Sequence, residues 1–76
     1  MKRNYIFHLR IKEILEKRNL TQKELAEMSG LRTASISEMA NNSRTVINKA
    51  HLAKIMDALD ITDLSEILEL KVEIKF

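Results

Sequence analysis

NLTQKELAEMSGLRTASISEMANN, residues 19–42 of a 76-residue chain, has the pattern of two short helices joined by a tight turn. Thr21 and Glu24 have the spacing of a capping box, in which hydroxyl and carboxylate each satisfy a free backbone N–H. Gly30 follows where the chain must turn, because glycine adopts positive φ without steric cost. Ile36 then stands among small and polar residues, which gives a second helix one inward side. The stretch therefore predicts a helix-turn-helix.

This motif resembles that of the phage Cro and C1 repressor family, also called the Xre family. The residues that carry the resemblance are Gln22, Ala26, Gly30 and Ile36. Two helices that cross within one turn leave room only for a small residue at Ala26, and an aliphatic at Ile36 fills the crossing. The resemblance covers about residues 11–59, and its helix-turn-helix spans 21–40.

The resemblance implies an all-α fold, a five-helix lambda-repressor-like DNA-binding domain with a short terminal β element. Residues 1–76 suffice for one domain of this kind. A first helix is expected over residues 9–18. Thr62 or Asp63 can cap a short fifth helix, because the apolar residues of 64–68 recur at helical spacing.

Both ends of the sequence carry strand signals. The last nine residues, LELKVEIKF, alternate apolar and charged side chains, which predicts a strand over 70–76. The first eight, MKRNYIFH, fit either a strand or a leading turn of helix, and we favour the strand. A lone strand leaves its backbone groups unpaired. The C-terminal strand therefore needs a partner, which is either residues 4–8 of the same chain or the same tail of a second subunit.

The composition narrows the functional class. The sequence has no Cys, so a disulfide or a thiolate metal site is excluded and a reducing cytoplasm is the expected location. His8 and His51 are isolated, and no catalytic set or cofactor motif is present, so we expect neither a metal, a cofactor nor an enzyme. No apolar run is long enough to cross a membrane.

The net charge of +2 hides an uneven distribution. Residues 1–32 hold eight Lys or Arg against four Glu, whereas residues 33–76 hold five against seven acidic groups. Positive charge is therefore concentrated ahead of the second helix of the motif, and this favours an anionic partner on that side.

The resemblance also implies which side chains contact bases. Family members contact base edges from the first two turns of the second helix, which here gives Thr33, Ala34, Ser37 and Glu38. A hydroxyl can donate or accept in the major groove, a methyl can touch thymine, and a carboxylate can accept from cytosine N4. None of these residues is Arg or Lys, so base discrimination is expected at the low end of about 1 kcal/mol per contact.

Phosphate contacts are expected around this helix. Gln22 matches the family's phosphate-binding position at the start of the first helix of the motif. Arg32 stands where the family has a Ser or Thr cap, so either the helix begins at Thr33 or Arg32 reaches a phosphate, and we favour the phosphate. The polar loop that follows can lie along the DNA backbone through Asn42, Ser43 and Arg44.

These features predict a sequence-specific transcriptional regulator. It would bind double-stranded DNA as a homodimer on a pseudo-palindromic operator and act as a repressor. The resemblance implies the C-terminal strand as one candidate dimer contact, and the sequence leaves the interface open. No small-molecule ligand is expected. Two alternatives are an antitoxin or accessory protein-interaction module on a helix-turn-helix scaffold, and a scaffold that has lost DNA binding.

Overall fold

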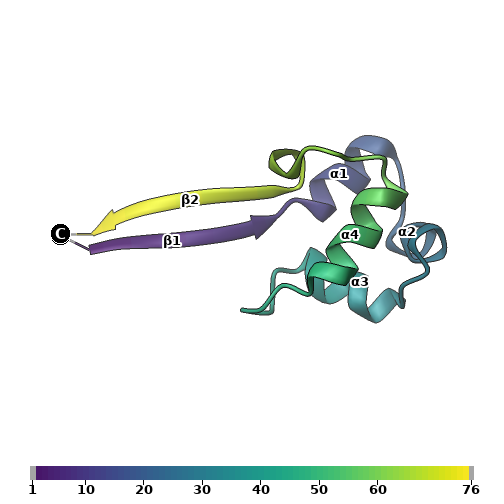
Figure 1. Cartoon of the computed structure of the whole chain (residues 1–76), viewed down its shortest axis with the longest axis horizontal. Coiled ribbons are helices and arrows are strands. Elements are labelled where there is room, and N and C mark those ends of the chain that lie inside the picture. The colour runs from purple at the N-terminus through teal and green to yellow at the C-terminus, as the bar shows by residue number, and fades with distance from the viewer. Residues whose placement is uncertain (1, 76) are drawn as a thin grey trace.

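The computed structural model describes residues 2–75, so Met1 and Phe76, the ends of the predicted domain, lie outside the described part. The elements in chain order are β1 (Lys2–Leu9), α1 (Ile11–Arg18), α2 (Gln22–Ser29), α3 (Thr33–Ala40), α4 (Lys49–Ala58), a 3₁₀ turn η1 (Leu64–Glu66) and β2 (Leu68–Lys75). Figure 1 shows two regions. We call residues 10–67 the helical head, and the pair β1 and β2, which projects from it, the ribbon. The molecule measures 45 × 20 × 19 Å.

The helix-turn-helix is closed by the local bonds that its sequence predicts. The Glu24 N–H donates to the Thr21 hydroxyl at 3.0 Å, and the Thr21 N–H donates to the Glu24 carboxylate at 3.0 Å, which completes the capping box of α2. Gly30 takes φ 75° and its N–H donates to the carbonyl of Ala26 at 2.9 Å. The chain therefore leaves α2 in a left-handed turn that only glycine adopts freely.

The other sharp turns use polar residues at positive φ. α1 ends at Asn19 (φ 57°), the turn after α3 ends at Asn42 (φ 54°), and the turn after α4 ends at Asp60 (φ 55°). Asn and Asp tolerate this conformation better than other side chains.

The core of the helical head consists entirely of apolar side chains. Residues of every helix, the end of β1 and the segment before β2 contribute to it: Leu9, Ile11, Leu15, Leu25, Ala26, Ile36, Ala40, Ile55, Leu59, Ile61 and Ile67. Each large aliphatic in such a core contributes about 1.5–3 kcal/mol of transfer free energy. Met28 on α2 is apolar but lies outside this core, with 51% of its surface exposed.

The prediction of an all-α, five-helix fold is wrong. Residues 2–75 form four α-helices and a two-stranded antiparallel sheet, and the expected fifth helix is the 3₁₀ turn η1. Asp63 does cap this turn, because its carboxylate accepts from the Ser65 N–H (3.0 Å) and hydroxyl (2.8 Å), and these bonds lower the pKa of Asp63. The helix stops there because the carbonyl of Ile67 already accepts from the Arg10 N–H at 2.8 Å. The residues from Leu68 onward therefore pair in the strand and cannot continue a fifth helix.

The ribbon confirms the N-terminal strand and uses the intrachain partner. β1 pairs with β2 along its whole length, from Lys2 opposite Lys75 to Leu9 opposite Leu68. The first helix consequently begins at Ile11, two residues later than expected, because Leu9 belongs to β1. The C-terminal strand also begins earlier than residue 70, since its pairing extends back to Leu68.

Candidate nucleic-acid interface

Helix α3 presents a small, polar face. Thr33, Ala34 and Glu38 are exposed and Ser37 is half-buried, whereas Ile36 on the opposite side is fully buried. The four predicted base-contacting residues are spaced one and four apart, so they share one side of the helix. The structure therefore brings them together on a single surface with an apolar anchor behind it.

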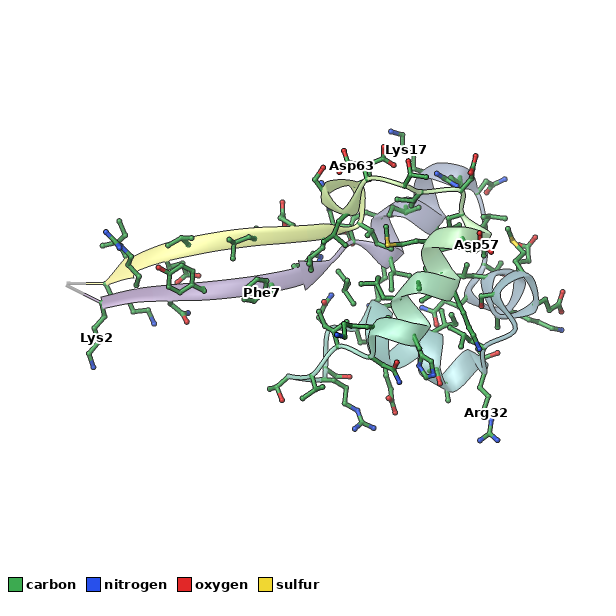
Figure 2. The ribbon with its side chains drawn as sticks, in the orientation of Figure 1. Lys2, Phe7, Lys17, Arg32, Asp57 and Asp63 are labelled. Carbon is green, nitrogen blue, oxygen red and sulfur yellow. The ribbon has the colours of Figure 1, made fainter. Side chains whose placement is uncertain are left out.

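The turn before α3 holds the first predicted phosphate ligand. Arg32 is the N-cap residue of α3, with extended backbone (φ −74°, ψ 145°) and no capping bond from its side chain. α3 thus begins at Thr33, behind a cap residue that makes no capping bond, and the favoured phosphate contact of Arg32 stays a prediction. The Arg32 side chain is exposed and points away from the helical head (Figure 2), so its guanidinium can be offered to an anion. Gln22, the other ligand on this side, is half-buried as the first residue of α2.

Two of the predicted DNA contacts bind each other in the free protein. A guanidinium nitrogen of Arg44 lies 3.1 Å from the Glu38 carboxylate, and both side chains are about half exposed or more (68% and 48%). An exposed pair of this kind contributes only about 0–1 kcal/mol, so it opens easily. If Arg44 turned to a phosphate, the Glu38 carboxylate would become free to accept from a base. The pair therefore joins a residue predicted to contact a phosphate to one predicted to contact a base.

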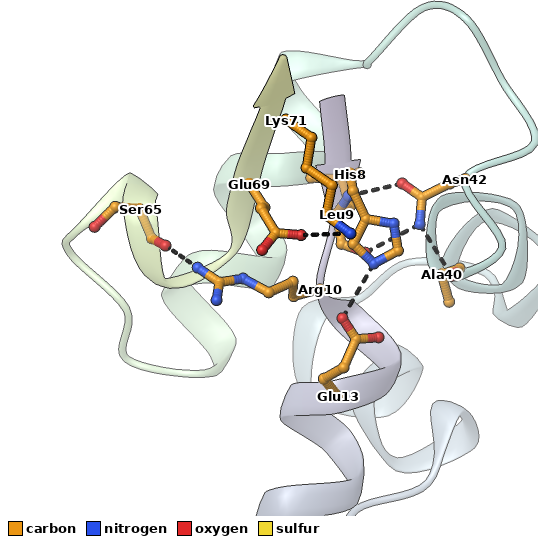
Figure 3. Close-up of polar contacts among 9 residues, drawn as sticks. All are labelled: His8, Leu9, Arg10, Glu13, Ala40, Asn42, Ser65, Glu69 and Lys71. Atoms are coloured by element: carbon orange, nitrogen blue, oxygen red, sulfur yellow. Dashed lines mark hydrogen bonds and ion pairs between the residues drawn. The ribbon is translucent and has the colours of Figure 1, made fainter. Parts of the chain in front are cut away.

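Asn42 has a structural role that the sequence did not reveal. Its side-chain oxygen accepts from the Leu9 N–H at 2.7 Å, and its side-chain N–H₂ donates to the Leu9 carbonyl at 3.1 Å (Figure 3). The amide thus imitates a strand partner for the last residue of β1 and ties the turn after α3 to the ribbon. Its expected phosphate contact would compete with these bonds. No local pattern could have indicated a partner 33 residues away.

Ser43 is held against α3. Its hydroxyl and its N–H both donate to the carbonyl of Glu38, at 3.3 and 3.4 Å. These bonds extend the end of α3 into the loop and keep Ser43 exposed beside the ion pair of Glu38 and Arg44. Ser43 and Arg44 therefore lie next to the predicted base-contacting face.

A groove of about 630 Å³ separates the ribbon from the loop after α3. Glu38, Asn42 and Arg44 contribute polar atoms to its lining. The apolar part of the lining is formed by Tyr5, Ile6, Phe7, Leu9, Met39, Val46 and Ile47. Sequence reasoning missed this groove, because it depends on how β1 lies relative to the loop. The clue available in the sequence was a cluster of aromatic residues in the first eight positions.

Other kinds of site find no support within residues 2–75. This part of the chain contains no group of three or more metal-ligating side chains. None of its helices is long and apolar enough to cross a membrane.

The fold and the exposed face of α3 define a helix-turn-helix protein, and a family comparison agrees. The model of the Cro/C1-type HTH DNA-binding domain matches residues 10–73, and the chain belongs to this family. The match includes all four helices and most of β2, and so extends beyond the resemblance at 11–59, while β1 lies outside it. No curated protein and no solved structure gives a significant match.

Proposed function

We propose that this DNA-binding protein is a sequence-specific transcriptional regulator, which represses by occupying a pseudo-palindromic operator as a homodimer. The observation that carries the proposal is the α3 face, where small and polar side chains are exposed over the buried Ile36. The side chains of Thr33, Ala34 and Ser37 are small, so α3 can lie deep in a major groove. A groove about 12 Å wide accommodates one helix.

In this proposal the contacts divide into two kinds. The base edges are contacted by Thr33, Ala34, Ser37 and Glu38, and the phosphates by Gln22, Arg32, Ser43 and Arg44. Phosphate contacts position the protein, and base contacts discriminate sequence. Asn42 contributes by holding the loop rather than by touching DNA, because its amide is occupied by Leu9.

The homodimer follows from the geometry of operators. Two recognition helices bind successive major grooves when they lie about 34 Å apart. The ribbon supports such a pairing, because Tyr5, Phe7, Leu70, Val72 and Ile74 leave roughly half of their surface exposed. A two-stranded ribbon is only marginally stable in water by itself. A dimer on the operator then blocks polymerase sterically, in the cytoplasm where transcription takes place.

Selection from a random duplex library at two salt concentrations tests the function, with the molar mass measured in parallel. We expect a palindromic sequence to be enriched by a dimer. Salt-sensitive binding without enrichment would refute sequence specificity, and no binding at low salt would refute DNA binding altogether.

A matched pair of variants tests the site. Arg44→Ala should weaken binding to all sequences and flatten the salt dependence by about one unit of slope, as expected for one lost phosphate contact. Lys17→Ala is the control, because Lys17 lies on the opposite side of the helical head from Arg32 (Figure 2). Equal slopes for the two variants would contradict the role of Arg44.

A second candidate function is a protein-interaction module, such as an antitoxin or accessory protein. The groove beside the ribbon favours it, because an apolar surface of this size suits a partner segment. A stable complex with a different protein, together with no selected duplex, would support this candidate over the regulator.

A further inference from the structure

The charges along β2 have no matching partners in β1. The outward polar side of β2 carries Glu69, Lys71, Glu73 and Lys75, and their cross-strand neighbours are His8, Ile6, Asn4 and Lys2. Residues 2–9 contain no acidic residue. Lys75 therefore faces a like charge, which is unfavourable in a cross-strand pair. The only acid–base contact among the four is within the strand itself, from Lys71 to Glu69 at 3.8 Å.

β2 also has an unused edge. Within residues 2–75 the sheet has two strands, so β2 pairs on one side with β1 and presents free N–H and C=O groups on the other. Figure 1 shows this edge running along the outside of the ribbon, away from the helices. An edge of eight residues is a ready template for another strand.

We propose, building on the homodimer of the proposed function, that β2 pairs antiparallel with β2 of a second copy about a two-fold axis at Val72. The result is a four-stranded sheet in the order β1-β2-β2-β1. In this register Lys71 faces Glu73 of the second copy, and Glu69 faces Lys75 of the second copy. The charge order Glu-Lys-Glu-Lys becomes complementary when the strand is reversed against itself, so four acid–base pairs form across the axis.

The charge pattern selects this register over its neighbours. A shift of two residues in either direction leaves no acid–base pair and places Lys opposite Lys and Glu opposite Glu. A shift of one residue places charged side chains opposite apolar ones. The apolar side also matches, because Val72 faces its own copy and Leu70 faces Ile74. Opposite charges and aliphatic pairs directly across a strand pair are each stabilising.

The occupant of this edge is a second copy rather than a different protein, because β2 complements itself. Pairing of β1 with β1 would bring Lys2, Arg3 and His8 together without any carboxylate. Pairing of β1 with β2 would leave a free edge on each copy and form open chains, whereas β2 with β2 is isologous and closes at two copies.

The position of the axis also suits DNA binding. Val72 lies four residues beyond Leu68, about 13 Å at the rise of an antiparallel strand. The two helical heads are then held on opposite sides of the axis, so their α3 helices can reach the spacing of about 34 Å between successive major grooves.

Two charge reversals and their mixture test the register. In a dimer of Lys71→Glu, the new carboxylate at position 71 of each copy faces Glu73 of the other copy. In a dimer of Glu73→Lys, the new ammonium group at position 73 of each copy faces Lys71 of the other copy. Each variant alone should dimerise about tenfold more weakly or worse than the wild type. In an equimolar mixture the new carboxylate faces the new ammonium group and the original pair faces itself, so the mixed dimer should recover nearly wild-type affinity. Analytical ultracentrifugation with one labelled variant measures all three constants.

Controls distinguish a loss of dimerisation from misfolding, and the register from the proposed function. Lys54→Glu, an exposed reversal on α4, should dimerise like the wild type. The double variant Lys71→Glu/Glu73→Lys should also recover, which shows that each change is tolerated by the fold. Dimerisation of both single variants at wild-type strength, or no recovery in the mixture, would overturn the register. If the register failed this test but a dimer still enriched a palindrome, the proposed function would stand with another dimer interface. If the mixture recovered dimerisation but no duplex was selected, the register would stand and the proposed function would fail.

Discussion

The helical head and the ribbon differ in how far they bury their apolar side chains. In the head, Leu25, Ile36 and Ile55 are completely buried, while in the ribbon Tyr5 and Phe7 remain 54% and 59% exposed. Both regions contain similar kinds of residue, but only the head encloses them within one chain. The difference indicates that the head is complete as a folded unit, whereas the ribbon has a surface that a second molecule can cover. Four predictions test this contrast.

The largest effect is expected in the core of the head. Leu25→Ala removes a fully buried side chain between helices and should lower the free energy of unfolding by about 2–5 kcal/mol, which can abolish folding of so small a domain. Met28→Ala on the same helix is the control, because Met28 is half exposed. Urea denaturation compares the two variants, and similar losses would contradict the assignment of the core.

The junction between the two regions should come second. Asn42→Gly removes the amide that satisfies the backbone of the buried Leu9, while glycine still tolerates the positive φ at this position. The loss should be about 1–3 kcal/mol, with faster hydrogen exchange at the Leu9 amide. Asn41→Gly, which alters a residue at φ −82°, is the control. A variant of Asn42 that lost only DNA affinity would instead support the phosphate contact expected from the sequence.

A smaller effect is expected at the start of α2. Thr21→Ala removes the hydroxyl of the capping box and should cost about 1 kcal/mol in denaturation experiments. Thr62→Ala, an exposed residue before η1, should change stability by less. Equal effects would mean that the capping box does not stabilise the helix-turn-helix.

The smallest effect on the isolated chain is expected in the ribbon. Phe7→Ser should alter the free energy of unfolding by less than about 1 kcal/mol in dilute protein, because most of the ring is already in water. In concentrated protein the loss of unfolding free energy should grow, since association stabilises the surface that the second molecule covers. A large loss at every concentration would show instead that the ribbon is part of a single-chain core.

The parts of the molecule that local chemistry determines were predictable from the sequence. The capping box at Thr21, the turn at Gly30 and the inward Ile36 follow from spacing alone, and they are found as expected. The alternation after Leu68 likewise predicted a strand. The family match at residues 10–73 confirms the assignment that these residues suggested.

The parts that depend on distant contacts were not predictable. The fifth helix was expected because residues 64–68 have helical spacing. Leu68 instead pairs with Leu9, and the Ile67 carbonyl accepts from the Arg10 N–H, both more than 55 residues away. The amide of Asn42 had the right chemistry for a phosphate, yet Leu9 occupies it. The pairing of Glu38 with Arg44 also emerges only when the loop folds back on α3. The roles proposed for the DNA-contacting side chains remain predictions.

In the proposed regulator the head binds DNA and the ribbon joins two copies. The most direct measurement compares wild type and Val72→Lys on duplexes that carry one or two copies of the selected half-site. Both proteins should bind a single half-site equally, and only the wild type should gain about 100-fold from the second half-site, because linked sites bind with high effective concentration. A variant that lost affinity for one half-site, or that kept the gain from two, would contradict this division between head and ribbon.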